Sequence, residues 1–321
     1  MRLLQTSLLC GVLAAVAPAV WAQAYPGKPV RMIAASSPGS AVDIVARIVA
    51  QKLSEQMGQQ VIIDNRAGAG GNLGAELAAK AVPDGYTLFM GTPAHAINTG
   101  LYRKLNYDLV RDFAPVSQVT SGAYVIVVHP SLPVKSVKEL ITLARSKPGQ
   151  LNYASAGSGN ATHLAGELFN RLAKVRLVHV PYKGSGPAML DLISGRVSLM
   201  FENMPGAVPH IKAGKVRALA QTGLKRTGAL PEVRTIAESG VPAYESLSWS
   251  GIAVASGTPR EVIARLNREI NAILATPEMR QKLSEQGADV VGGTPEAFAE
   301  HIKREREKWS RVVRDANIVA N

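Results

Sequence analysis

The sequence predicts an α/β protein in which two domains surround a ligand cleft. From residue 30 onward, short β-rich runs alternate with helical patterns, an arrangement typical of strand-helix-strand units in a largely parallel sheet. A second series of such units begins after residue 129 and repeats the plan of the first. Two extended segments, 113–128 and 246–255, connect the two series. We therefore expect a discontinuous first domain, an inserted second domain and a hinge between them.

The N-terminus predicts export. Arg2 precedes an apolar stretch at 8–20 that ends in an Ala-x-Ala pattern at 22–24, which is typical of a cleavable secretory signal. We assign residues 1–24 to a signal peptide and expect the protein in the periplasm. The sole cysteine, Cys10, lies in that segment, so the rest of the chain is expected to hold no disulfide and no thiol nucleophile.

The charge balance is positive, with 36 Lys and Arg against 24 Asp and Glu. We expect no nucleic-acid partner, because the one strongly basic stretch, 303–314, is interrupted by Glu305 and Glu307 and aromatic residues make up only 5% of the chain. A positive field does favour encounter with small anions. No segment after residue 24 approaches the roughly 20 apolar residues of a membrane span. We also expect the protein to be a monomer.

Apolar periodicity and turn residues place the elements of the first series. They are strand 30–34, helix 42–57, strand 61–64, a helix that follows the glycine-rich loop 68–74 and ends at 82, and strand 86–90. Gly58 is expected to end the first helix. The extended segment 113–128 comes next.

The second series and the C-terminal helices are placed in the same way. The predicted elements are helix 136–146, strand 151–155, helix 162–172, strand 176–180, helix 187–193, strand 197–201, helix 207–212 and strand 216–221, then helices 259–275, 277–285 and 294–315 with a short strand at 289–291. This order predicts residues 25–124 with 248–321 as domain 1 and residues 125–247 as domain 2.

Two loops rich in Gly and Ser lie between a strand end and a helix start, one in each series: Ser36-Ser37-Pro38-Gly39-Ser40 and Gly157-Ser158-Gly159-Asn160. The first amides of a helix lack internal partners and the helix dipole adds positive charge, so each loop is expected to present free N–H groups to a carboxylate or phosphate. Such residues are also ordinary helix caps, and capping remains the alternative for either loop alone. Their equivalent places in two halves favour one ligand gripped from both sides.

Further candidates enter helices or follow strands nearby. Asp43, in the first turn of a predicted helix, either complements the helix dipole or meets the ligand, and His163 either donates to an anion or serves packing and capping. Glu202 and Asn203 end a strand and would face the same crevice, with solvated turn residues as the alternative. Thr92 and His95 follow strand 86–90 in a comparable position.

Catalytic and cofactor motifs are missing from the sequence. The loop 68–72 does not match a dinucleotide-binding motif, because Leu73 stands where the last glycine belongs. The chain has no Gly-x-Ser-x-Gly elbow and no His-Glu-x-x-His. We therefore expect no cofactor, no metal and no enzymatic activity, with a hydrolase or isomerase assembled from distant residues as an alternative.

Six segments carry a resemblance to a known family: YPGKPV (25–30), DNRAGAGGN (64–72), PDGYTL (83–88), LNYAS (151–155), HVPYKG (179–184) and PHIKAGK (209–215). With these segments the chain resembles the tripartite tricarboxylate transporter substrate-binding proteins, also called the Bug family, over essentially its whole length after residue 24. The resemblance implies a type II periplasmic-binding-protein fold that closes by hinge motion on a carboxylate. It also implies delivery to a two-component membrane permease, with a sensor that docks on a receptor as the alternative role.

The resemblance, carried over by position, implies ligand contacts at Ser37, Gly39, Ser40 and Asp43 in one domain and at Gly157, Ser158, Gly159, Thr162 and His163 in the other. Ser36, Thr92, His95, Glu202 and Asn203 complete the predicted ligand-binding set. The chain departs from the family pattern at Ser40, where Gly is common, and at Glu202, where Asp is common. The identity of the ligand is therefore not predicted.

Overall fold

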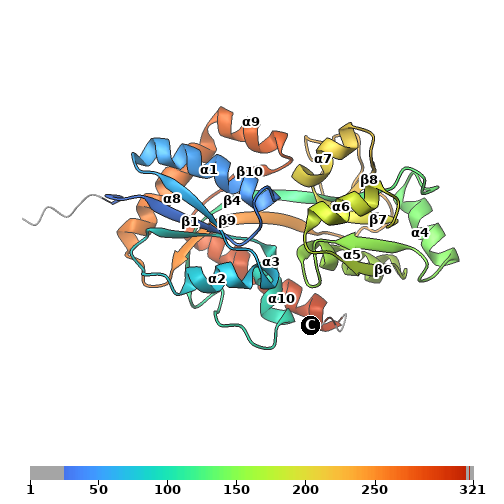
Figure 1. Ribbon diagram of the computed structural model, residues 1–321, viewed down its shortest axis with the longest axis horizontal. Coiled ribbons are helices and arrows are strands. Elements are labelled where there is room, and N and C mark those ends of the chain that lie inside the picture. The colour runs from blue at the N-terminus through green and yellow to red at the C-terminus, as the bar shows by residue number, and fades with distance from the viewer. Residues whose placement is uncertain (1–24, 316–317, 319–321) are drawn as a thin grey trace, which may run out of the picture.

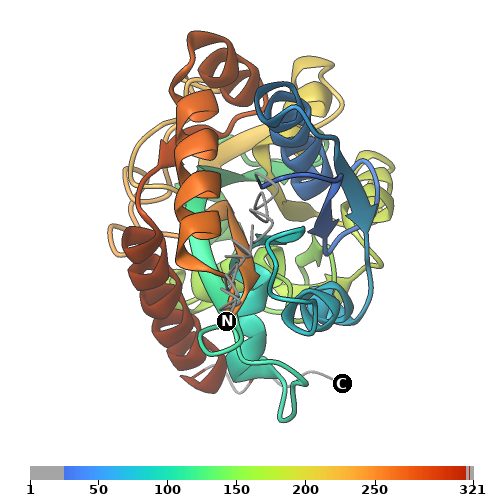
Figure 2. The same ribbon diagram turned by 90° about the vertical axis from the view of Figure 1, so that its left-hand side faces the viewer.

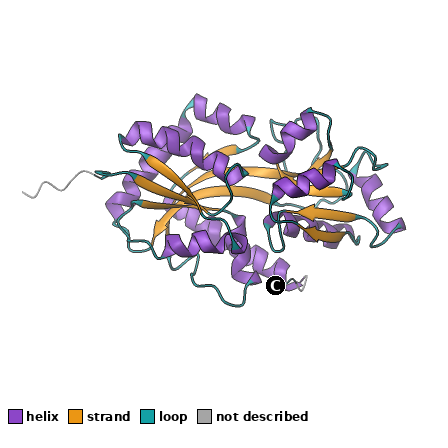
Figure 3. Ribbon diagram, in the orientation of Figure 1, coloured by secondary structure: helices purple, strands orange, loops and turns teal. Residues whose placement is uncertain are grey.

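A computed structural model describes residues 25–315 and residue 318, so the predicted signal peptide lies outside the described residues. In chain order its elements are β1 (Val30–Ala34), α1 (Ala41–Met57), β2 (Val61–Asn65), η1 (Ala69–Gly71), α2 (Asn72–Ala79), β3 (Thr87–Gly91), α3 (Pro93–Leu101), β4 (Phe113–Val128), α4 (Val137–Ser146), β5 (Asn152–Ser155), α5 (Ala161–Ala173), β6 (Val178–Pro181), α6 (Ser185–Ile193), β7 (Leu199–Asn203), α7 (Met204–Lys212), β8 (Arg217–Gln221), β9 (Leu247–Ala255), α8 (Arg260–Ala275), α9 (Pro277–Glu285), β10 (Asp289–Gly292) and α10 (Pro295–Asp315). The α/β class is confirmed (Figure 3).

The strands form one continuous sheet in the order β2-β1-β3-β9-β4-β7-β5-β6, with β8 and β10 also paired to β4. β1 is parallel to β2 and β3, and β5 is parallel to β6 and β7, as the alternating sequence pattern predicts. The long strand β4 crosses from one end of the molecule to the other (Figure 1). Residues 113–123 of β4 pair with β9, whereas residues 124–128 pair with β7 and β8.

The crossing of β4 defines two lobes. We call the part with β1–β3, β9, β10, α1–α3 and α8–α10 the first lobe, and the part with β5–β8 and α4–α7 the second lobe (Figure 1). Figure 2 looks onto the first lobe, with the orange and red C-terminal helices toward the left of the view and the blue N-terminal helix toward the upper right. The finer domain boundaries at 124/125 and 247/248 stay a prediction.

Apolar clusters on both faces of the sheet stabilise each lobe. In the first lobe, α1, α8 and α9 cover one face and α2, α3 and α10 the other. In the second lobe, α4 and α5 cover one face and α6 and α7 the other. Ala161 and Leu164 of α5 belong to the same buried cluster as Leu101 of α3 and Trp309 of α10, so apolar packing also joins the lobes. Within the described residues, no helix is both long and apolar enough to cross a bilayer.

Helix α3 is absent from the elements predicted from the sequence. It begins with Thr92 as N-cap and Pro93 at the first helical position, and the backbone N–H of Thr92 donates to Nδ1 of His95 at 3.0 Å. A Thr-Pro pair at a strand end is a helix-start signal. The helix is only 9 residues long and ends at Tyr102 with no glycine cap, which explains why the periodicity did not reveal it.

Candidate functional site

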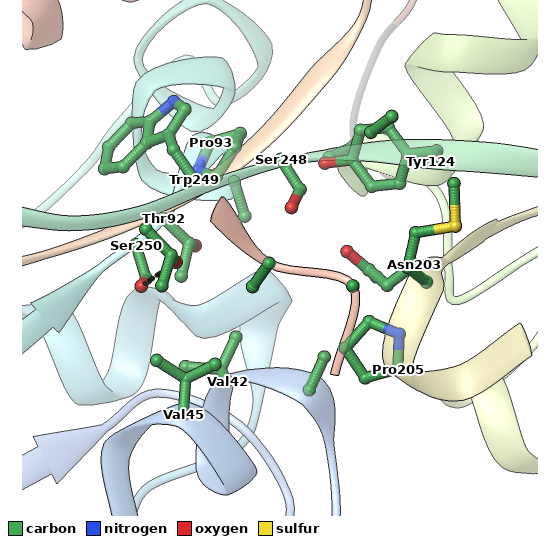
Figure 4. Close-up of a pocket in the computed structure, with 18 of the residues that line it drawn as sticks. Val42, Val45, Thr92, Pro93, Tyr124, Asn203, Pro205, Ser248, Trp249 and Ser250 are labelled. Atoms are coloured by element: carbon green, nitrogen blue, oxygen red, sulfur yellow. Dashed lines mark hydrogen bonds between the residues drawn. The ribbon is translucent and has the colours of Figure 1, made fainter. Parts of the chain in front are cut away.

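A pocket lies between the lobes, where the first turns of four helices meet. Its wall includes the opening residues of each helix: Ala41 and Val42 of α1, Pro93 and Ala94 of α3, Ala161 of α5, and Met204 and Pro205 of α7 (Figure 4). α1 and α3 belong to the first lobe, and α5 and α7 to the second. The positive ends of four helix dipoles therefore converge on one pocket. The N–H groups of Ala41, Ala161 and Met204 have no partner inside their own helices, whereas Pro93 of α3 and Pro205 of α7 carry no N–H.

Strands β4 and β9 supply the remaining polar wall. Tyr124 of β4, Ser248 of β9 and Asn203 at the end of β7 direct oxygen atoms toward the centre of the pocket (Figure 4). The hydroxyls of Thr120 and Ser250 lie 2.6 Å apart in the same wall. None of the residues that line this pocket carries a formal charge. An anion would thus be held by neutral dipoles instead of a basic side chain.

The entry of α1 is fixed by Asp43. Ser40 caps the helix, and its hydroxyl accepts from the Asp43 N–H at 3.3 Å. The Asp43 carboxylate turns back onto the loop, where it accepts from the Gly39 N–H at 2.8 Å, from Asn65 Nδ2 at 2.9 Å and from Arg47 Nε at 3.0 Å. Burial acts to raise the pKa of Asp43, but these hydrogen bonds outweigh it and the pKa lies below the ordinary value. Asp43 therefore shapes the loop that precedes the pocket wall.

The serines before α1 border the pocket without lining it. The hydroxyls of Ser36 and Ser40 are hydrogen-bonded at 2.8 Å, and the Ser36 carbonyl accepts from Asn65 Nδ2. Ser37 and Gly39 are exposed. The first residue of the chain that lines the pocket is Ala41, directly after Ser40.

The entry of α5 follows the same design with a different acceptor. Asn160 caps the helix by accepting from the Thr162 N–H at 3.1 Å, and the Gly159 N–H donates to Nδ1 of His163 at 2.9 Å. The Gly157 N–H donates to the Ser155 hydroxyl, and the backbone N–H of Ala156 donates to the Thr162 hydroxyl. Ser158 is exposed, whereas Asn160 and Ala161 line the pocket. The expectation of free amides is therefore wrong for five loop residues, whose N–H groups donate within their own loop, to the strand before it or to the helix that follows: Gly39, Ser40, Gly157, Gly159 and Asn160.

His163 is buried against the half-buried His179 and does not line the pocket. Its ring stacks on His179 with centroids 3.7 Å apart and an interplanar angle of 11°. Burial, followed by the proximity of His179, lowers the pKa of His163 to about 3. A neutral ring whose Nδ1 accepts from Gly159 carries its proton on Nε2, 4.0 Å from Glu167. This geometry fits the packing and capping alternative.

The remaining candidates divide between the wall and the layer behind it. Thr92 and Asn203 line the pocket. His95, only 1% exposed, lies behind the wall, where burial lowers its pKa to about 4 and its Nε2 faces Gly71. Glu202 is 2% exposed, so the alternative of a solvated turn residue is wrong for it. One Glu202 oxygen accepts from the Asn203 N–H at 2.8 Å, and burial raises the pKa of its carboxyl.

The structure thus brings the helix entries that follow both predicted loops to one pocket, while most of the named loop residues stand at its border. Their roles as ligand contacts remain a prediction. Three residues that face the pocket from the two extended segments are absent from the predicted set: Tyr124, Ser248 and Ser250. A usable signal existed, because hydroxyl residues interrupt otherwise apolar strands in both segments. Among the described residues, no group of three or more His, Cys, Asp or Glu is placed to hold a metal ion.

Comparisons with known proteins agree with these features. The profile of the TctC family, the tripartite tricarboxylate transporter family receptor, matches residues 45–318. A protein from the tcbD-tcbE intergenic region of a Pseudomonas is 42% identical over 93% of this chain and 89% of its own length. Protein BugT of Bordetella pertussis is 36% identical over 94% of this chain and 93% of its own length.

Solved structures of similar fold include proteins with bound carboxylates. An R. palustris protein solved with adipate has a TM-score of 0.88 and 40% identity, covering 92% of this chain and 99% of that one. MatC from Rhodopseudomonas palustris, solved with bound malate, has a TM-score of 0.83 and 32% identity, covering 90% of this chain and 100% of that one. The predicted fold and the prediction of a binding protein rather than an enzyme are confirmed by these relatives. The chain belongs to the TctC family of tripartite tricarboxylate transporter receptors.

Proposed function

We propose that this chain captures a small carboxylate in the pocket between its lobes and delivers it to the membrane subunits of a tripartite tricarboxylate transporter. The observation that carries the proposal is the convergence of four helix N-termini on a pocket whose lining residues are all uncharged. Adipate and malate in the two similar structures are both dicarboxylates, which supports this class of ligand. The predicted signal at 1–24 and the family both favour a periplasmic location.

The helix entries supply the binding energy in this proposal. A hydrogen bond from a backbone N–H to a carboxylate contributes about 1.5–3 kcal/mol, and a favourable helix dipole adds about 0.3–1 kcal/mol. Ala41 of the first lobe and Ala161 of the second present first-turn amides from opposite sides. A ligand that contacts both lobes favours the closed form, because those contacts are lost when the lobes separate.

Substitution of proline at the first helical position tests the amides directly. Proline is compatible with that position and removes only its N–H. The preceding residues, Ser40 and Asn160, already have the extended backbone that proline requires, with ψ of 161° and 157°. We expect Ala41→Pro or Ala161→Pro to weaken binding of adipate or malate at least about tenfold in calorimetry, with the fold preserved.

Two controls separate the lost amide from other effects. Ala41→Val adds bulk but keeps the N–H, so we expect a smaller loss than for Ala41→Pro. Arg260→Pro places proline at the exposed first position of α8, whose residues are not part of the pocket wall, and should leave affinity unchanged. Unchanged affinity in both pocket variants would contradict the proposed grip. Failure of the wild-type chain to bind any small carboxylate would contradict the proposed function itself.

A further inference from the structure

A single carboxylate on α10 holds both tryptophans of the described chain. One oxygen of Glu305, Oε2, accepts from the indole N–H of Trp249 at 3.1 Å and from that of Trp309 at 2.9 Å. The other oxygen lies 3.6 Å from the ammonium of Lys308. The Glu305 side chain is only 12% exposed. It is therefore a desolvated, ion-paired acceptor shared by two donors that have little access to water.

Trp249 connects this carboxylate to the pocket. It lies between Ser248 and Ser250, and all three residues line the pocket (Figure 4). Its ring turns away from the pocket into the apolar cluster beneath α10, edge-on to Phe298 at 5.8 Å and to His301 at 5.2 Å. The wall of the pocket and the C-terminal helix are thus joined through one side chain.

The segment of β9 around Trp249 pairs with a strand on only one edge. β3 pairs with β9 only from Val254 to Gly251, where β3 ends. Beyond that point β9 is held on one edge, by β4, while its other edge is free of β3. Ser248 and Ser250 therefore owe part of their placement to the buried indole between them.

We propose that Glu305 is a positioning residue of the ligand site: it fixes the indole of Trp249 and thereby sets the polar wall that Ser248 and Ser250 present to the ligand. The inference rests on the proposed function of the pocket. It differs from a role in stability alone, in which Glu305 would only satisfy the buried N–H of Trp309. The two roles predict different behaviour of Trp249.

Fluorescence isolates Trp249. The chain has three tryptophans, so Trp21→Phe with Trp309→Phe makes Trp249 the only emitter. In this background we expect Glu305→Ala to shift the emission of the unliganded protein to longer wavelength and to weaken binding of adipate and malate at least about tenfold. Glu305→Gln keeps an acceptor oxygen of the same reach, so its affinity should stay within about threefold of the parent.

Glu300→Ala is the matched control, because Glu300 lies on the same helix, is 57% exposed and pairs only loosely with Lys303 at 3.9 Å. It should change neither readout. In a Trp249→Phe background, Glu305→Ala should alter affinity less than about twofold, since the indole through which it acts is gone. If Glu305→Ala does not fold, Glu305→Met, which fills a similar space and offers no acceptor oxygen, takes its place in the same cycle.

Unchanged emission and affinity in a folded Glu305→Ala variant would overturn the inference, as would an equal loss with and without Trp249. If the parent protein binds neither acid, the proposed ligand class fails, but the emission of Trp249 still reports whether Glu305 holds it. The two failures are therefore distinguishable.

Discussion

The entry loops of α1 and α5 share one design and differ in their surroundings. Each has a glycine with positive φ, 76° at Gly39 and 74° at Gly159, whose N–H donates to a side chain four residues later. The acceptor is the carboxylate of Asp43 in the first loop and the imidazole of His163 in the second. Gly39 faces solvent, whereas Gly159 is buried against Leu101 of the other lobe. Similar sequence thus produces one open loop and one that is part of a contact between lobes.

A loop sequence therefore specifies its own turn but not the surface against which the loop packs. A Cβ at Gly159 would lie 1.8 Å from Leu101 Cδ2, while a Cβ at Gly39 would meet nothing within 4 Å. The packing at Gly159 in the second loop therefore depends on the relative position of the lobes, whereas the surroundings of Gly39 in the first loop do not. Four comparisons of matched variants test this contrast.

The largest effect is expected from alanine at the two glycines. Gly39→Ala introduces only an unfavourable left-handed backbone, which costs about 1 kcal/mol. Gly159→Ala adds a clash with Leu101 and should destabilise the protein by about 3 kcal/mol in urea unfolding. The loss in Gly159→Ala with Leu101→Ala should be smaller than the sum of the two single losses, because the second change removes the clashing atoms. Equal destabilisation by the two glycine variants would show that the lobe contact does not distinguish the loops.

Removal of the Asp43 acceptor is expected to be next in size. Asp43→Ala leaves the amides of Gly39 and Asn65 without their acceptor and should reduce the free energy of unfolding by about 2 kcal/mol. Asp43→Asn keeps one acceptor oxygen and should cost less. Urea unfolding of both variants checks the order. If the alanine variant is as stable as the parent, water replaces the carboxylate, and the first loop does not depend on Asp43.

The elements of the fold were largely predictable, because each depends on local periodicity and caps. β4 and α9 have the predicted bounds, and Gly58, with φ of 68°, ends α1. The pocket wall was not predictable to the same degree. The hydroxyls of Thr120 and Ser250 meet across 130 residues of sequence, and nothing in either strand alone indicates the other. His163 could not be assigned from sequence, because its stacking on His179 depends on the pairing of β5 with β6.

His163 and Asp43, the acceptors in the two loops, should lose their contributions to stability in different pH ranges. The pKa of His163 falls from an ordinary 6.5 to about 3 in the folded protein, so its contribution to stability is complete above pH 6.5. Below that, the unfolded chain takes up the proton first, and stability falls by up to about 1.4 kcal/mol per pH unit. Asp43 has a lowered pKa, so its contribution persists until the pH drops below about 3.8 and is lost through its folded value.

Urea unfolding between pH 7 and 5.5 checks this separation. His163→Gln should remove only part of the decline over that interval, because His95 and His179, whose pKa values burial lowers to about 4, also contribute to it. Asp43→Asn should leave its slope unchanged. His210→Gln, in the last turn of α7, controls for the loss of a histidine outside both loops. A decline that His163→Gln does not reduce would assign the acid sensitivity to other groups.

The smallest effect is expected at the N-caps of α1 and α5, where substitutions in the two loops should destabilise the protein equally. Ser40 and Asn160 each accept from an amide of the first turn, at 3.3 Å from Asp43 and 3.1 Å from Thr162. Loss of an N-cap costs about 1 kcal/mol regardless of what the loop touches. Ser40→Ala and Asn160→Ala should therefore destabilise the protein to a similar extent in urea. Ligand affinity should distinguish them, because Asn160 lines the pocket and Ser40 does not. Calorimetry with adipate should show the weaker binding in Asn160→Ala, and the reverse order would place the ligand nearer the first loop.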